Sequence, residues 1–156
     1  MRYITYEDKH IISQIARLHE SELERQNQDY QQTTLSVALR EEMLINGLYH
    51  GTDVLITHIV DDTLIGVIWG RYLKHEQKVL IEFLYVALRY RQQGIASKLK
   101  DEIEQWAIEQ GAEEIQGTVD AHNIMMQQLN QQKGYQVSKV IMTKKLPLNN
   151  EHNKDK

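Results

Sequence analysis

A twelve-residue stretch from Arg89 to Lys100, "RYRQQGIASKLK", has the residue types of an anion site. An apolar run precedes it and helical spacing follows it, so we expect a turn between a strand and a helix. The first amides of a helix lack carbonyl partners and lie at the positive end of its dipole. Small residues at Gly94 and Ala96 would let a diphosphate reach those amides, and Arg91 would add a charged donor. The predicted cradle consists of the backbone amides of Gln92, Gln93, Gly94, Ile95, Ala96 and Ser97.

This motif differs from the two best-known phosphate-binding loops. It lacks the Gly-Lys-Ser/Thr ending of a Walker loop, and its single glycine does not make a dinucleotide fingerprint. The window from Phe83 to Lys100 contains no acid and would suit a local anion, although its charges alone are more typical of a solvated helix start. Its cations are Arg89, Arg91, Lys98 and Lys100.

The motif needs a strand before it and an amphipathic helix after it, and the sequence predicts both. "KVLIEFLYVAL", at 78–88, is rich in β-branched and aromatic residues. The helix ends at Gly111 and has one apolar face, made of Ile95, Leu99, Ile103, Trp106 and Ala107. A helix at 35–47 is predicted from the spacing of Leu35, Ala38, Leu39, Met43 and Leu44. The remaining segments predict strands at 3–6, 53–60, 63–73, 114–119 and 135–146, and helices at 9–23 and 124–133. The order β-αα-βββ-α-β-α-β is that of a single α/β domain with a mixed sheet.

Composition narrows the function classes. The chain has 156 residues and no cysteine, which excludes disulfides, thiolate metal sites and a cysteine nucleophile. A net charge of −4 argues against broad binding to nucleic acid. No apolar run reaches the roughly 20 residues of a membrane span, and "MRYITYEDKH" lacks the apolar region of a signal peptide. The seven histidines have no metal-ligand spacing. We expect a cytoplasmic protein without a metal.

The sequence resembles a known family at two places. "IEFLYVALRYRQQGIASKL" is similar to the acetyl-CoA binding segment of the GNAT superfamily of N-acetyltransferases, in which Arg-x-x-Gly-x-Gly/Ala opens a helix after a strand. "NIMMQQLNQQKGY" resembles the family's Asn-x-x-Ala-x-x-x-Tyr-x-x-x-Gly-Phe helix. The order of elements agrees over residues 2–146. We therefore expect an acetyltransferase domain at 1–146 and a polar tail at 147–156.

The resemblance implies acetyl-CoA bound where two central parallel strands splay apart. The pyrophosphate would lie on the amides of 92–97, and the pantetheine would pair with the backbone of Leu84, Tyr85 and Val86. An amide of that strand would hold the thioester oxygen. Asn123 matches an asparagine that hydrogen-bonds the pantetheine arm, although a plain helix N-cap explains it equally well.

Acetyl transfer to an amine needs a group that takes the amine proton, and Glu82 is the candidate. It lies inside an otherwise apolar strand, where alternation predicts that it shares a face with Leu84 and Val86. Partial desolvation there would raise its pKa and make it a better base. It also matches an acidic position on this strand in several family members. The alternative is a structural carboxylate satisfied by a neighbour.

The usual acid of the family is missing. A tyrosine that protonates the leaving thiolate stands seven residues after the capping asparagine, and here that position is Asn130. An asparagine cannot supply the proton. Solvent, Tyr85, Tyr135 or His122 could do so, although a core residue is the favoured interpretation of Tyr135.

Three functions therefore remain open. The first is an N-acetyltransferase acting on a small cationic or peptide amine, with a homodimer as the expected assembly. The alternative is a catalytically weak acyl-CoA-binding or regulatory module, and the third function is that of a phosphate-binding protein unrelated to acetyl-CoA. Glu20, Glu24 and Asp29 lie near a polar break where the family binds its acceptor, but a solvated helix face is the favoured interpretation of these acids.

Overall fold

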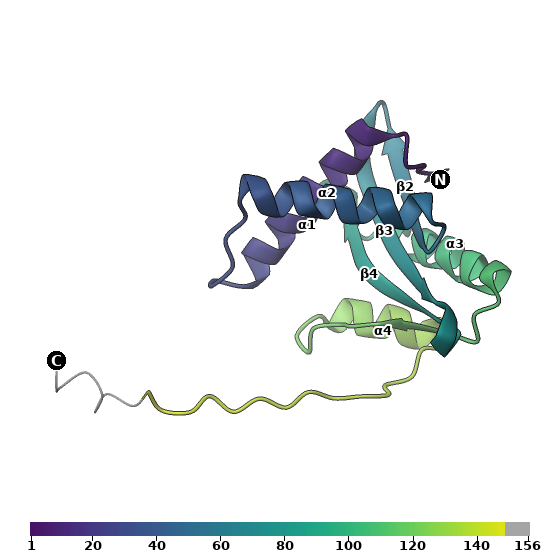
Figure 1. Cartoon of the computed structure of the whole chain (residues 1–156). Helices are drawn as coiled ribbons and strands as arrows, with labels where there is room; N and C mark the ends of the chain where they lie inside the picture. The colour runs from purple at the N-terminus through teal and green to yellow at the C-terminus, as the bar shows by residue number, and fades with distance from the viewer. Residues whose placement is uncertain (149–156) are drawn as a thin grey trace. The chain divides into compact units, whose positions relative to one another are not determined.

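The computed structural model describes residues 1–148 (Figure 1). The chain divides into two compact units, Met1–Thr118 and the residues from Val119 onward. The elements of the first unit are β1 (Arg2–Tyr3), α1 (Lys9–Gln26), α2 (Thr34–Tyr49), β2 (Asp53–Val60), β3 (Thr63–Leu73), the 3₁₀ turn η1 (Lys74–Glu76), β4 (Lys78–Val86), the 3₁₀ turn η2 (Leu88–Tyr90), α3 (Ile95–Gln110) and β5 (Glu114–Gly117). The second unit contains α4 (Ile124–Gln132).

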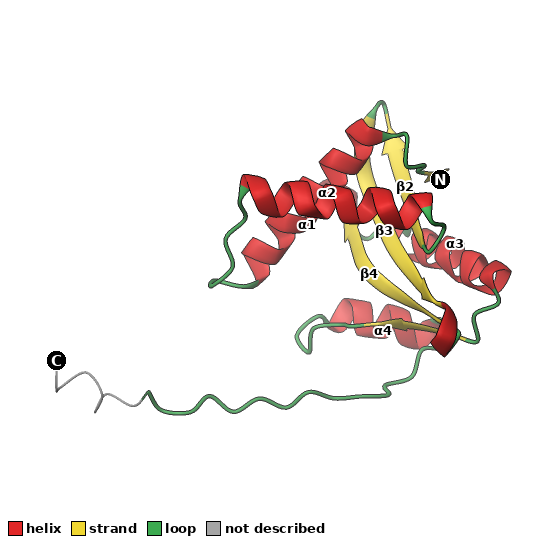
Figure 2. Ribbon diagram, in the orientation of Figure 1, coloured by secondary structure: helices red, strands yellow, loops and turns green. Residues whose placement is uncertain are grey.

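A five-stranded sheet in the order β1-β2-β3-β4-β5 forms the centre of the first unit (Figure 2). Neighbours from β1 to β4 are antiparallel, whereas β4 and β5 are parallel. The predicted hairpin turns at Asp61 and Asp62, whose φ angles of 48° and 62° match the twist of a two-residue hairpin. The mixed sheet with helices on its faces confirms the predicted α/β class.

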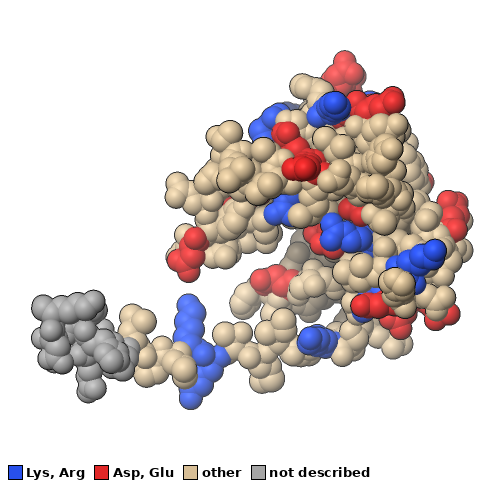
Figure 3. Space-filling model, viewed as in Figure 1, with Lys and Arg blue, Asp and Glu red and all other residues tan. Residues whose placement is uncertain are grey.

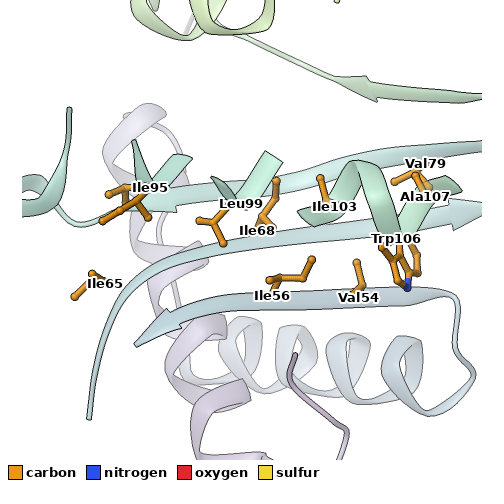
Figure 4. Packing of buried hydrophobic residues seen from close by; sticks show 11 residues of the cluster. Val54, Ile56, Ile65, Ile68, Val79, Ile95, Leu99, Ile103, Trp106 and Ala107 are labelled. Atoms are coloured by element: carbon orange, nitrogen blue, oxygen red, sulfur yellow. The ribbon is translucent and has the colours of Figure 1, made fainter. Parts of the chain in front are cut away.

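α3 covers one face of the sheet, and its apolar side chains point at the strands (Figure 4). All five residues predicted from helical spacing are buried in this cluster, where they meet Val54, Ile56, Ile65, Ile68, Val79 and Val86. Gly70 of β3 lets the helix come close, because a Cβ there would lie 2.4 Å from Cδ1 of Ile103. The packing fixes where α3 begins relative to β4.

Replacing Leu99, which is fully buried, by alanine is expected to lower the free energy of unfolding by about 2–5 kcal/mol, because a cavity is left under α3. Ile108 of the same helix is 62% exposed, so Ile108→Ala is the matched control and should change stability by about 0.5 kcal/mol or less. Urea unfolding followed by circular dichroism measures both. Equal losses would contradict the packing described for α3.

α1 and α2 cover the opposite face. α2 begins with a capping box in which Thr33 and Ser36 exchange side-chain and backbone hydrogen bonds. The structure confirms the helix predicted at 35–47, but the residues that face the sheet differ from those predicted. Leu44 is buried, while Leu35, Leu39 and Met43 are exposed, because the helix turns Val37, Leu44 and Leu48 toward the sheet.

In the second unit, α4 is capped by Asn123 as predicted. The strand expected at 135–146 is not formed. A strand is held by its ladder partners, and in the described part of the chain this segment has none. Its apolar side chains are exposed, including Val137, Val140, Ile141, Met142 and Leu146. Of the predicted tail at 147–156, residues 149–156 lie outside the described residues.

Charged side chains of both signs lie on the surface of the molecule. On the face drawn in Figure 3, basic and acidic side chains are interspersed. Over residues 1–148, no helix is both long and apolar enough to cross a bilayer. Within the same residues, no group of three or more His, Asp or Glu side chains is arranged to hold a metal ion.

Candidate functional site

The turn before α3 presents free backbone amides. Gly94 is the N-cap residue, with φ 82° and ψ 7°, and the first bond back into the helix runs from the Lys98 amide to the Gly94 carbonyl at 3.1 Å. The amides of Ile95, Ala96 and Ser97 therefore precede the first intrahelical bond and point out of the helix start. This is the anion-binding geometry that the sequence predicts.

The space over these amides is open. A Cβ built on Gly94 would meet no other group within 4 Å, and the positive φ of Gly94 is one that side-chain-bearing residues rarely adopt. The residues present therefore fit a diphosphate at this helix start.

The edge of β4 next to this turn is also free. β4 pairs with β5 only from Lys78 to Ile81, whereas its pairing with β3 continues to Val86. From Glu82 to Val86, no strand among residues 1–148 occupies the β5 side of β4. The ladder between the two parallel strands thus ends at Ile81 and Gly117, and Leu84, Tyr85 and Val86 lie beyond it on the β5 side of β4.

Arg91 links the strand end to the turn. Its Nε donates to the Val86 carbonyl at 2.8 Å, and its guanidinium lies 6.0 Å from the centroid of the Tyr85 ring. The side chain is exposed, as are Arg89 and Lys98, but Lys100 is only 3% exposed. Lys100 therefore does not belong to the cationic surface that its sequence position suggested, because it lies on the buried side of α3.

Glu82 lies at an irregularity in the sheet. The β3–β4 register shifts between Trp69 and Gly70, which pair with Phe83 and Ile81 and leave Glu82 as the extra residue of a bulge. The Glu82 carboxylate lies 3.9 Å from Nη1 of Arg71.

The bulge changes the face that Glu82 occupies. Arg71 lies over the ring of Trp69, on the face covered by α1 and α2, whereas Leu84 and Val86 pack on the α3 face. The prediction that Glu82 shares a face with Leu84 and Val86 is wrong, because the extra residue breaks the alternation. The side chain is 29% exposed, so its desolvation is partial.

Asp53 and Trp69, which the sequence alone does not single out, hold Arg71 in place. Asp53 is buried and accepts from Nε1 of Trp69 at 2.8 Å and from Nε of Arg71 at 3.4 Å. For the bulge at Glu82 the sequence does contain a signal, the glycine at Gly70 inside the β3 run, since a glycine within a strand often marks a bulge.

A buried histidine and acid of α1 lie on the same face. The His19 ring centroid is 4.6 Å from that of Phe83 and 5.6 Å from that of Trp69. Glu20 is 1% exposed, accepts from the Tyr30 hydroxyl and lies 3.7 Å from Nη2 of Arg40. A solvated helix face is therefore the wrong interpretation for Glu20. It anchors the loop between α1 and α2 instead.

The pKa of His19 implies a pH-dependent stability. Burial, and secondarily Arg40, lowers this pKa from 6.5 to about 4, with Glu20 opposing. The unfolded chain therefore takes up the proton first. The stabilisation is complete above pH 6.5 and is lost as the pH falls from 6.5 to about 4. At 1.36 kcal/mol per pKa unit, the difference between the His19 pKa values of the unfolded and the folded chain corresponds to roughly 3 kcal/mol of stability.

Between pH 7 and pH 4, the free energy of unfolding should fall both in the unsubstituted protein and in His19→Leu. We expect the fall to be roughly 3 kcal/mol larger in the unsubstituted protein, because only that protein has the buried imidazole. His10 of the same helix is exposed, so His10→Leu should follow the unsubstituted protein. Denaturant unfolding at several pH values measures the difference. A pH dependence that His19→Leu leaves unchanged would rule out this role.

The remaining predicted residues belong to the second unit. The Asn123 side chain accepts from the Met126 amide at 3.2 Å, so the N-cap interpretation is realised. Asn130 is buried in α4, and its carbonyl accepts from the amides of Lys133 and Tyr135. Tyr135 is half-buried after the helix ends. The structure therefore brings together the predicted residues of β4 and α3 in the first unit, whereas Asn123, Asn130 and Tyr135 belong to the second.

The comparisons with known proteins agree with this geometry. The model of the acetyltransferase (GNAT) family matches residues 13–135. No curated protein sequence matches the chain. Among solved structures, a protein from Staphylococcus aureus subsp. aureus assigned to the GNAT acetyltransferases is 37% identical, with a TM-score of 0.71. That match covers 75% of this chain and 98% of the other.

Two more distant structures share the fold. An aminoglycoside acetyltransferase from an uncultured soil metagenomic sample, in complex with sisomicin, is 17% identical with a TM-score of 0.70, and the match covers 95% of each chain. AAC(6')-Iy, in complex with the bisubstrate analog CoA-S-monomethyl-acetylneamine, is 18% identical with a TM-score of 0.60, over 74% of this chain and 82% of the other. With the family model matching most of the chain, this protein belongs to the GNAT acetyltransferase family.

Proposed function

We propose that this protein is an N-acetyltransferase that moves the acetyl group of acetyl-CoA directly to a primary amine. One observation carries the proposal: the free edge of β4 from Glu82 to Val86 lies beside the open helix start at Gly94, within one unit. A strand edge offers backbone partners to an extended amide-containing arm, and a helix start offers amides to a diphosphate. CoA contains both groups.

The donor would be held mainly by backbone. The amides of residues 92–97 would bind the pyrophosphate, with Arg91 adding a positive charge. Leu84, Tyr85 and Val86 would pair with the pantetheine. Asn123 stays a candidate for that arm through the family resemblance, in addition to its N-cap bond.

The reaction needs a neutral amine, and a lysine-like amine has a reference pKa of about 10.4. Glu82 would accept the amine proton, directly or through water. The amine nitrogen forms a bond to the thioester carbonyl carbon, and the carbon–sulfur bond breaks. The thiolate then takes a proton from solvent or from Tyr85 or Tyr135. A thiol pKa of about 8.5 makes it a fair leaving group, so Asn130 need not prevent turnover.

The acceptor is proposed to be a small cationic amine or a peptide amine. Two of the structural neighbours are aminoglycoside acetyltransferases, whose acceptors are amines of this small cationic class. A cytoplasmic location and a homodimer remain part of the proposal, and light scattering would test the dimer.

The test is CoA thiol release from acetyl-CoA with a panel of polyamines, aminoglycosides, amino acids and short peptides between pH 7 and 9. We expect release that depends on one amine class, rises with pH and is matched by acetylated amine in the mass spectrum. Asn130 favours the second candidate, a weak acyl-CoA-binding module. That candidate predicts tight acetyl-CoA binding by the folded protein with no amine-dependent release.

A further inference from the structure

Arg71 of β3 lies between two carboxylates and contacts the proposed base. Its Nε is 3.4 Å from Oδ1 of Asp53, and its Nη1 is 3.9 Å from Oε1 of Glu82. We infer that Arg71 is a positioning residue that fixes the direction of the Glu82 carboxylate, an inference that rests on the proposed function.

Asp53 gives Arg71 a fixed anchor. It is 6% exposed and accepts from three donors: Nε1 of Trp69, Oγ1 of Thr52 at 2.9 Å and Nε of Arg71. A carboxylate buried to this extent requires such partners. The Arg71 guanidinium also lies 5.6 Å from the Trp69 ring, so two contacts fix its plane. Arg71 therefore reaches toward Glu82 from a rigid base.

The sheet register creates the arrangement. Asp53 of β2 is the direct partner of Arg71 in β3, and the bulge in β4 places Glu82 on the face of Arg71. Arg71 is closer to Asp53 than to Glu82. Of the two carboxylates that contact Arg71, Glu82 is more distant and more exposed than Asp53. It is therefore the carboxylate that an amine can reach to deliver its proton.

The other groups on this face do not replace Arg71. Among the described residues they include His19, Glu20 and Arg25 of α1, Arg40 of α2, Asp53 of β2, Tyr85 of β4 and Arg91. Arg25 pairs with Glu22, and Arg91 donates to the Val86 carbonyl. Arg40 pairs with Glu20, and the lowered pKa of His19, about 4, keeps it neutral at higher pH. Among the described residues, Arg71 is thus the cation that the structure pairs with Glu82.

The experiment records the ¹³C signal of the Glu82 carboxyl carbon at one fixed pH, with Glu82→Gln to assign it, together with kcat and KM for the best amine and for acetyl-CoA. In Arg71→Met we expect the Glu82 signal to move, because the carboxylate loses its partner, and kcat to fall about tenfold while the KM for acetyl-CoA stays unchanged. Arg71→Lys, which keeps the charge but not the fork toward Asp53, should lose less of kcat.

Lys78→Met is the matched control, because it removes a cation of β4 that pairs with Glu76. It should leave the Glu82 signal and kcat unchanged. A Glu82 signal that stays unchanged in folded Arg71→Met would overturn the inference. A signal that moves while kcat does not would remove Arg71 and Glu82 from the reaction. Absence of turnover in the unsubstituted protein would count against the proposed function, and the carbon signal would still decide whether Arg71 holds the Glu82 carboxylate.

Discussion

Gly94→Val is expected to weaken acetyl-CoA binding by about 100-fold or more. A side chain at this position would cover the amides of Ile95 and Ala96, and each lost charge-assisted hydrogen bond costs about 1.5–3 kcal/mol. The φ of 82° also disfavours valine, so the free energy of unfolding should fall by about 1–2 kcal/mol. Isothermal titration calorimetry with CoA measures the affinity.

Gly111→Val provides the matched control for this substitution. Gly111 ends the same helix with φ 86°, and a Cβ there also meets nothing within 4 Å. The control should lose similar stability and keep its affinity for CoA. If both variants bound CoA as the unsubstituted protein does, the helix start of α3 would not be the diphosphate site.

Glu82→Gln is expected to lower kcat/KM for the amine by about 100-fold or more, since a positioned general base contributes about 10²–10⁴ in rate. Glutamine keeps the size and the hydrogen-bonding capacity but cannot accept the amine proton. The KM for acetyl-CoA should change little, because the donor is held by backbone groups.

Glu76→Gln serves as its control, because Glu76 precedes the same strand and pairs with Lys78 on the surface. Its kinetics should equal those of the unsubstituted protein. A kcat/KM that Glu82→Gln left unchanged across pH would show that another group or solvent takes the proton.

The sequence was sufficient for the elements that carry local patterns. The spacing of Leu99, Ile103 and Trp106 predicts the inner face of α3, and the single glycine at Gly94 predicts the open helix start. Both depend on residues adjacent in the chain, where one period or one backbone conformation is decisive.

The parts that failed depend on contacts between distant segments. The face of Glu82 follows from a bulge opposite Trp69, which strict alternation cannot reveal. Glu20 is buried because Tyr30 and Arg40 reach it, and its own helix gave no sign of this. The strand predicted at 135–146 has a suitable composition, but composition supplies no ladder partner.

Amide NMR spectra recorded during a titration with acetyl-CoA test the central claim most directly, because each backbone group of the proposed site reports separately. We predict the largest shifts at the amides of Gly94, Ile95, Ala96 and Ser97 and along β4 from Leu84 to Val86, with small shifts at Gly111. Saturable binding whose shifts lie elsewhere, or no shifts at millimolar acetyl-CoA, would contradict the account.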